Sequence, residues 1–123
     1  SENSLDLGGV TIIDPVEAEE QERIQTFGKI LYKKRQRKGM TIYDANRLVR
    51  ERNYFGALMV ETGAADAFIS GLTRDYPKTI LPSLQTIGVN KGVNRVAGMY
   101  IMNTPRGPYF FPDATINLNP TAE

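Results

Sequence analysis

The sequence predicts an α/β fold with a mixed sheet that is flanked by helices and ends in a β-hairpin. Two short apolar runs typical of buried strands, 10–13 and 67–69, alternate with segments of helical periodicity. Near the C-terminus, two strand-like segments, 96–102 and 109–111, enclose a turn that contains Pro and Gly and predict the hairpin. The order strand, helices, strand, helix and hairpin is typical of α/β proteins with a mixed sheet.

The composition is that of one soluble domain, and it excludes several catalytic mechanisms and kinds of metal site. The chain has 123 residues, of which 24% are charged, and a formal net charge of +1. It has no His and no Cys, which excludes Ser-His-Asp and Cys-His catalysis, thiolate or imidazole zinc sites and disulfides. A charge near zero argues against nucleic acid and anionic membranes as partners. With no signal-peptide pattern and no Cys, we expect a cytoplasmic protein.

The longest predicted helix covers residues 16–37. One apolar stripe repeats in it at spacings of three and four residues and consists of Ile24, Phe27, Ile30 and Leu31. Glutamates crowd the start of this segment and cations crowd its end, an order that complements the helix dipole. Gly39 is expected to end the helix.

Two shorter helices are predicted next, over 41–52 and 54–62. Thr41 is expected to cap the first of them, with Asp44 completing an imperfect capping box. Asn53 is expected to cap the second. Because the segment 54–62 is apolar nearly all round, we expect that helix to be buried.

The segment Ser70-Gly71-Leu72-Thr73 lies between the second apolar run and a helix predicted from Tyr76 to about Thr86. Ligands of parallel α/β sheets bind at the carboxyl ends of strands, and free amides at a helix start can bind an anion. The alternative is an ordinary loop whose Ser and Thr cap the helix. The sequence leaves both interpretations open, and it contains neither a dinucleotide-binding fingerprint nor a P-loop.

Two further features also have two interpretations each. A cationic run at the end of the first helix is either a solvated helix end or a site for a phosphate or nucleotide tail. Its members are Lys33, Lys34, Arg35, Arg37 and Lys38. Asp113, just beyond the last predicted hairpin strand, is either a turn carboxylate or a general base or substrate-orienting group.

Three stretches are specific in combination: ADAFISGLT at 65–73, LPSLQ at 81–85 and FPDATIN at 111–117. They resemble the phosphate acetyl/butyryl transferase family, and the Ser-Gly-Leu-Thr form resembles one branch of it, the C-terminal domain of bacterial NADP-dependent malic enzymes. The resemblance implies a partial phosphotransacetylase fold, similar to isocitrate/isopropylmalate dehydrogenases, over residues 9–123, with 1–8 as a linker. Complete domains of this family are longer, so we expect a fragment of a larger protein.

The resemblance also implies ligand-binding residues. Ser70 and Gly71 match the family's Ser-Gly at the cleft where phosphate or acyl-CoA groups bind, and Thr73 shares their loop. Arg35 matches an Arg that helps to bind coenzyme A, and Asp113 matches the Asp of the family's Phe-Ala-Asp segment. No catalytic residue and no metal ligand is assigned, because the family's Asn-Asp-Leu-Ser-Arg-Gly signature is absent from the chain.

Three functions compete on this basis. The first is a regulatory, acetyl-CoA-sensing domain of a malic enzyme, an NADP-dependent oxidoreductase that converts malate to pyruvate. Leu81, which stands where the family carries Arg, favours it. NADP and a divalent metal would then bind elsewhere in the parent enzyme, and the fragment alone would not be catalytic. The second is a lobe of an active phosphate acetyltransferase, which forms acetyl phosphate and CoA from acetyl-CoA and phosphate.

The third function is an oligomerisation module, which the apolar segment 54–62 and the hairpin favour. The partners expected across these functions are further copies of the chain, the remainder of the parent chain and an acyl-CoA ligand.

Overall fold

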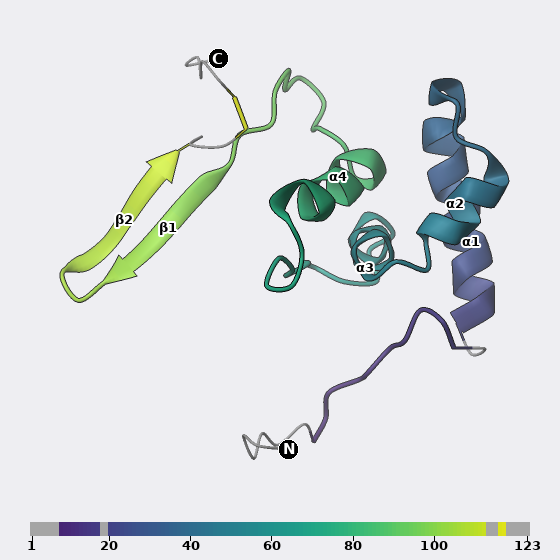
Figure 1. Cartoon of the computed structure of the whole chain (residues 1–123), viewed down its shortest axis with the longest axis horizontal. Helices are drawn as coiled ribbons and strands as arrows, with labels where there is room; N and C mark the ends of the chain where they lie inside the picture. Colours follow the sequence, from purple (N-terminus) through teal and green to yellow (C-terminus); the bar gives the residue numbers. More distant parts are fainter. Residues whose placement is uncertain (1–7, 18–19, 113–115, 118–123) are drawn as a thin grey trace. The chain divides into compact units, whose positions relative to one another are not determined.

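The computed structural model describes residues 8–17, 20–112 and 116–117. The chain divides into two compact units, Ser1–Gly88 and Val89–Glu123. Within the described residues, the first unit is helical and the second contains a two-stranded sheet (Figure 1).

The first unit contains four α-helices among its described residues. They are α1 (Gln21–Arg35), which continues into the single 3-10 turn η2 (Gln36–Lys38), then α2 (Ile42–Leu48), α3 (Arg52–Glu61) and α4 (Tyr76–Thr86). Helix α1 packs against α2, and α3 packs against α4. Because α1 also contacts both α3 and α4, the two pairs form one bundle.

Helix α1 is shorter than the sequence predicts. The expected start at residue 16 is wrong, because a turn at Asp14 precedes the helix. The Asp14 side-chain Oδ1 accepts from the Val16 N–H at 3.0 Å, and its backbone carbonyl accepts from the Glu17 N–H at 3.1 Å. At the other end Gly39 has φ of +87°, the left-handed conformation of a helix stop, so the predicted stop is confirmed.

The predicted capping box of α2 is confirmed. Thr41 Oγ1 accepts from the Asp44 N–H at 3.1 Å, and Asp44 Oδ2 accepts from the Thr41 N–H at 3.4 Å. The hydrogen bonds from the Thr41 side chain and backbone lower the pKa of Asp44. The predicted cap of α3 is wrong, because α3 begins at Arg52 and Asn53 lies inside its first turn.

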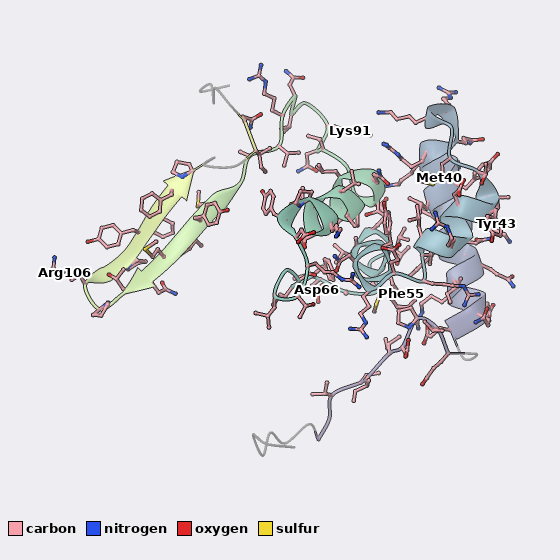
Figure 2. The ribbon with its side chains drawn as sticks, in the orientation of Figure 1. Met40, Tyr43, Phe55, Asp66, Lys91 and Arg106 are labelled. Carbon is pink, nitrogen blue, oxygen red and sulfur yellow. The ribbon has the colours of Figure 1, made fainter. Side chains whose placement is uncertain are left out.

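The core of the first unit lies where α1, α2 and α3 meet. Its buried residues are Ile24, Phe27, Leu31, Ala45, Val49, Tyr54, Phe55 and Leu58. The apolar stripe of α1 therefore faces inward as predicted, and α3 is largely buried as predicted. The rings of Phe27 and Phe55 meet edge to face, with centroids 5.3 Å apart. Phe55 lies within the helical bundle (Figure 2).

The predicted mixed sheet is absent from the described part of the chain. Residues 10–13 and 67–69 form no strand. The sequence also predicts a last short strand over 115–118, and its residues 116–117 form none either. Residues 115 and 118 of that strand lie outside the described residues. The physical reason is that a short β-branched run becomes a strand only when a neighbouring backbone pairs with it, and neither of the first two runs has such a partner among the described residues.

The second unit contains the predicted hairpin, formed by β1 (Met99–Thr104) and β2 (Gly107–Pro112). The strands are antiparallel, with Ile101 opposite Phe110 and Tyr100 opposite Phe111. Because directly opposed residues share a face, both faces of the hairpin carry apolar side chains. Arg106 lies at the turn between the strands (Figure 2). No helix of the described residues is long and apolar enough to cross a membrane.

Candidate functional site

The loop before α4 carries three of the predicted ligand-binding residues. Ser70 and Thr73 are exposed on it. Gly71 has φ of +121°, a conformation that side-chain-bearing residues rarely adopt, and open space lies where its Cβ would be. Gly71 therefore serves the turn of the backbone and leaves room for a ligand to approach the loop. Asp66 lies on the segment that leads from α3 into this loop (Figure 2).

Two contacts hold this loop against the helices. The Phe68 ring lies on Gly56 of α3, so closely that a Cβ at Gly56 would be 2.4 Å from the ring. The Ser70 hydroxyl donates to Asn53 Oδ1 at 2.8 Å, and Asn53 Nδ2 donates to the Lys78 carbonyl at 3.0 Å. Asn53 therefore connects the loop to the first turns of both α3 and α4.

A small hollow of about 50 Å³ adjoins Asn53. Its lining residues are Glu51, Arg52, Asn53, Arg74 and Lys78. Three of these five are cations, and two of the three, Arg52 and Arg74, form no ion pair within the described part of the chain. Guanidinium groups hold phosphate and carboxylate well, so this hollow suits a small anion.

Lys78, the third cation, is already paired with a carboxylate. Its ammonium lies 2.8 Å from Asp75 Oδ2, and both side chains are largely exposed. The hydrogen bond from Lys78 and the charges of Lys78 and Arg74 lower the pKa of Asp75. An anion in the hollow would therefore depend mainly on Arg52 and Arg74 for its charge partners.

Arg35 belongs to a different hollow, of about 300 Å³, at the end of α1. That hollow is lined by Arg35, Lys38, Gly39, Met40, Asp44, Arg47, Leu48 and Gln85. It shares no lining residue with the hollow beside Asn53. The structure therefore places Arg35 and the Ser70 loop at two separate sites.

Tyr54 is a buried tyrosine of α3 that contacts a residue lining the Arg35 hollow. Its hydroxyl donates to Gln85 Oε1 at 2.8 Å. Burial raises the pKa of Tyr54, the charge of Glu51 raises it further, and the charge of Arg35 opposes the rise. The phenol is therefore held neutral and serves as a hydrogen-bond donor to a wall of the Arg35 hollow.

The cations at the end of α1 have different roles: one stabilises the bundle, and others line a hollow. The Lys34 ammonium donates to the Glu61 carboxylate and to the backbone carbonyl of Thr86. Thr86 is the last residue of α4, where a cation satisfies an unpaired carbonyl and interacts favourably with the helix dipole. Lys34 therefore stabilises the bundle, whereas Arg35 and Lys38 line a hollow.

Replacing Lys34 by methionine is expected to destabilise the bundle by about 1–2 kcal/mol. The variant keeps most of the aliphatic stem but loses the donor to Glu61 and Thr86. Urea denaturation followed by circular dichroism measures the loss. Lys33→Met is the matched control because the neighbouring Lys33 is exposed. Equal stability of the two variants would show that the contacts of Lys34 contribute nothing.

Two further residues singled out in the sequence are Asp113 and Leu81. Asp113 lies outside the described residues. Leu81 is half-exposed on α4.

The sequence did not predict four residues of the hollow as site residues: Arg52, Asn53, Arg74 and Lys78. One local signal could have indicated a shared face, which is the four-residue spacing of Arg74 and Lys78 across the start of α4. No cluster of three or more carboxylates in the described part of the chain could hold a metal ion.

Comparison with known proteins points to one family. The family model described as phosphate acetyl/butaryl transferase matches residues 1–123. The phosphate acetyltransferase of Bacillus subtilis is 36% identical over 99% of this chain and 36% of its own length. That of Clostridium acetobutylicum is 32% identical over 100% of this chain and 38% of its own length. The chain thus spans little more than a third of these relatives.

Solved structures give the same answer. The EutD phosphotransacetylase from Staphylococcus aureus matches with a TM-score of 0.71 and 30% identity, over 92% of this chain and 33% of that one. A phosphotransacetylase from Streptococcus pyogenes matches with a TM-score of 0.67 and 31% identity, over 89% of this chain and 32% of that one. The relation to isocitrate/isopropylmalate dehydrogenases stays a prediction.

These matches correct one expectation. The assignment to a malic enzyme, with an oxidoreductase activity and NADP, is wrong, since the relatives and solved structures named above are phosphate acetyltransferases or phosphotransacetylases. That assignment depends on Leu81 and on the Ser-Gly-Leu-Thr form, which are a few positions within a match that spans the whole chain.

Proposed function

Because the chain belongs to the phosphate acetyl/butaryl transferase family, we propose that it forms part of a phosphate acetyltransferase. The observation that carries this proposal is the match of the family model to the whole chain, supported by 36% identity to the Bacillus subtilis enzyme. The chain spans about a third of its relatives, so the proposed activity is that of the complete protein.

The reaction of such an enzyme moves an acetyl group between a sulfur and an oxygen. A phosphate oxygen attacks the thioester carbonyl carbon of acetyl-CoA, a carbon–oxygen bond forms and the carbon–sulfur bond breaks. The products are acetyl phosphate and coenzyme A, whose thiolate takes up a proton. Both substrates are anionic, so the enzyme must hold negative charge and bring two anions together.

The part of this reaction that we assign to this chain is binding of phosphate near the Ser70 loop. Arg52 and Arg74 form no ion pair among the described residues and line the hollow beside Asn53, together with the carboxylate of Glu51. Asn53 in turn holds the Ser70 hydroxyl. A phosphate in this hollow would meet guanidinium groups and lie beside a loop whose glycine leaves open space.

The larger hollow at Arg35 is our candidate for the phosphates of an acyl-CoA. Three cations line it, Arg35, Lys38 and Arg47, and Asp44 opposes them with one carboxylate. At about 300 Å³ it is larger than the hollow beside Asn53. Its separation from the Ser70 loop suits a reaction in which the two substrates carry their negative charges at different places.

Titration of the chain with inorganic phosphate is expected to shift the backbone amide resonances of the Ser70 loop and of the first turn of α4. In Arg74→Gln, one guanidinium of the hollow is removed, and the affinity is expected to fall roughly two- to fivefold, as for an exposed ion pair. The measurement is nuclear magnetic resonance at constant ionic strength, with chloride as the reference anion.

Lys29→Gln is the matched control for this titration. Lys29 is an exposed cation on α1 that lines neither hollow. The control removes the same charge without touching the site, so its phosphate affinity should equal that of the unmodified chain. Shifts confined to other parts of the chain, or equal losses in the two variants, would contradict the proposed phosphate site.

A further inference from the structure

The direction of the hydrogen bond between Asn53 and Ser70 follows from the third member of the network. The Asn53 amide lies between the Ser70 hydroxyl, 2.8 Å from Oδ1, and the Lys78 carbonyl, 3.0 Å from Nδ2. A backbone carbonyl can only accept, so the amide nitrogen must face Lys78. The flipped amide would place two oxygens against each other with no proton between them.

The amide oxygen of Asn53 therefore faces Ser70, and this fixes what Ser70 can offer to a ligand. An amide oxygen only accepts, so the Ser70 hydroxyl must be the donor in this bond. A hydroxyl has one proton and two acceptor lone pairs. With its proton engaged by Asn53, Ser70 can accept a hydrogen bond from a ligand but can donate one only by breaking the bond to Asn53.

We propose that Asn53 is a positioning residue that makes Ser70 a hydrogen-bond acceptor, so that the site prefers an anion that still carries a proton. Inorganic phosphate near neutral pH carries at least one proton, whereas sulfate carries none. This inference rests on the proposed function, which places phosphate beside the loop. The guanidinium groups of Arg52 and Arg74 line the hollow and attract both anions. Ser70 does not line the hollow itself, but its hydroxyl lies 2.8 Å from Oδ1 of the lining residue Asn53, so the discrimination arises where an anion at the edge of the hollow meets this hydroxyl.

The size of the preference is that of one hydrogen bond. Phosphate can donate its proton to a Ser70 lone pair, whereas sulfate either faces that lone pair without a proton or breaks the bond to Asn53. The net contribution of such a bond corresponds to a preference of roughly two- to tenfold for phosphate over sulfate. Charge alone would give no such preference, because sulfate is at least as strongly charged near neutral pH.

The test compares inorganic phosphate with sulfate on the whole chain at matched ionic strength, by the same amide resonances. The unmodified chain is expected to prefer phosphate. Asn53→Leu replaces the amide by an apolar side chain of similar size. The Ser70 proton is then free for a ligand, so the preference should disappear.

Two further variants keep the test independent of any damage that Asn53→Leu does to α3. Ser70→Ala removes the acceptor itself at an exposed position and should also abolish the preference. Arg74→Gln should lower the affinity for both anions and leave the ratio of the two affinities unchanged. Equal binding of phosphate and sulfate by the unmodified chain, or a preference that persists in Ser70→Ala, would overturn the inference alone. Absence of binding by either anion would overturn the proposed phosphate site together with it.

Discussion

Leu31→Ala is expected to lower the free energy of unfolding of the helical unit by about 2–5 kcal/mol, the range for a buried leucine truncated to alanine. Leu31 is fully buried on α1, among aromatic and aliphatic side chains that include Phe27, Phe55 and Leu58. Removing the isopropyl group there loses its burial and leaves a cavity that rigid neighbouring rings cannot fill. The expected loss is measured by urea denaturation followed by far-ultraviolet circular dichroism.

This loss would be a large share of the whole stability, because domains are stable by only about 5–15 kcal/mol. The core of this unit is also small, with eight residues in its buried cluster among the described part of the chain. Leu72→Ala is the matched control, since it makes the same chemical change at a fully exposed leucine. Similar losses in the two variants would mean that the described core does not hold the unit together.

The helices of this chain could be predicted from sequence because their signals are local. The stripe of α1, the capping box of Thr41 and Asp44, and the stop at Gly39 each depend on residues within a few positions of one another. The hairpin could be predicted for the same reason, because its two strands are joined by a short turn. Such features form from neighbouring residues and need no information about distant parts of the chain.

The predictions of strands at 10–13 and 67–69 were wrong because a strand depends on pairing that local sequence does not determine. A β-branched run specifies the tendency to be extended, but its backbone groups need another backbone alongside to form a sheet. At 67–69 the chain instead uses Phe68 to pack on Gly56. The apolar pattern therefore indicated burial correctly for Phe68, which is half-buried, but not the structure that achieves it.

The candidate site could be predicted only in part, for the same physical reason. The Ser70–Thr73 loop has a recognisable composition and position, so the sequence located it. The role of Asn53 depends on contacts to Ser70 and Lys78, which lie 17 and 25 residues away in sequence. Asn is also a favoured helix cap, so the local preference supported the wrong role. Long-range polar contacts of this kind carry no periodic signal in a sequence.

Gly56→Ala tests the contact between the helical bundle and the Ser70 loop, and its effect should depend on Phe68. With Phe68 present, the new Cβ would lie 2.4 Å from the ring. The ring must move, at an expected cost of about 1–3 kcal/mol for overpacking. Because the moving ring lies two residues before Ser70, the bond from Ser70 to Asn53 should weaken as well. Phosphate titration and urea denaturation measure the two effects.

The sign of this effect should reverse when Phe68 is first truncated. Gly in the interior of a helix costs about 0.8–1 kcal/mol relative to Ala, so the same Gly56→Ala change should stabilise a chain that already carries Phe68→Ala. A double-mutant cycle therefore gives a coupling free energy of about 1–3 kcal/mol, which is the removed clash alone, because the helix preference of Ala over Gly acts in both backgrounds and cancels. Gly56→Ala that destabilises both backgrounds equally would mean that Phe68 does not lie on Gly56 in solution. The packing of one ring against one glycine would then have no part in holding the Ser70 loop.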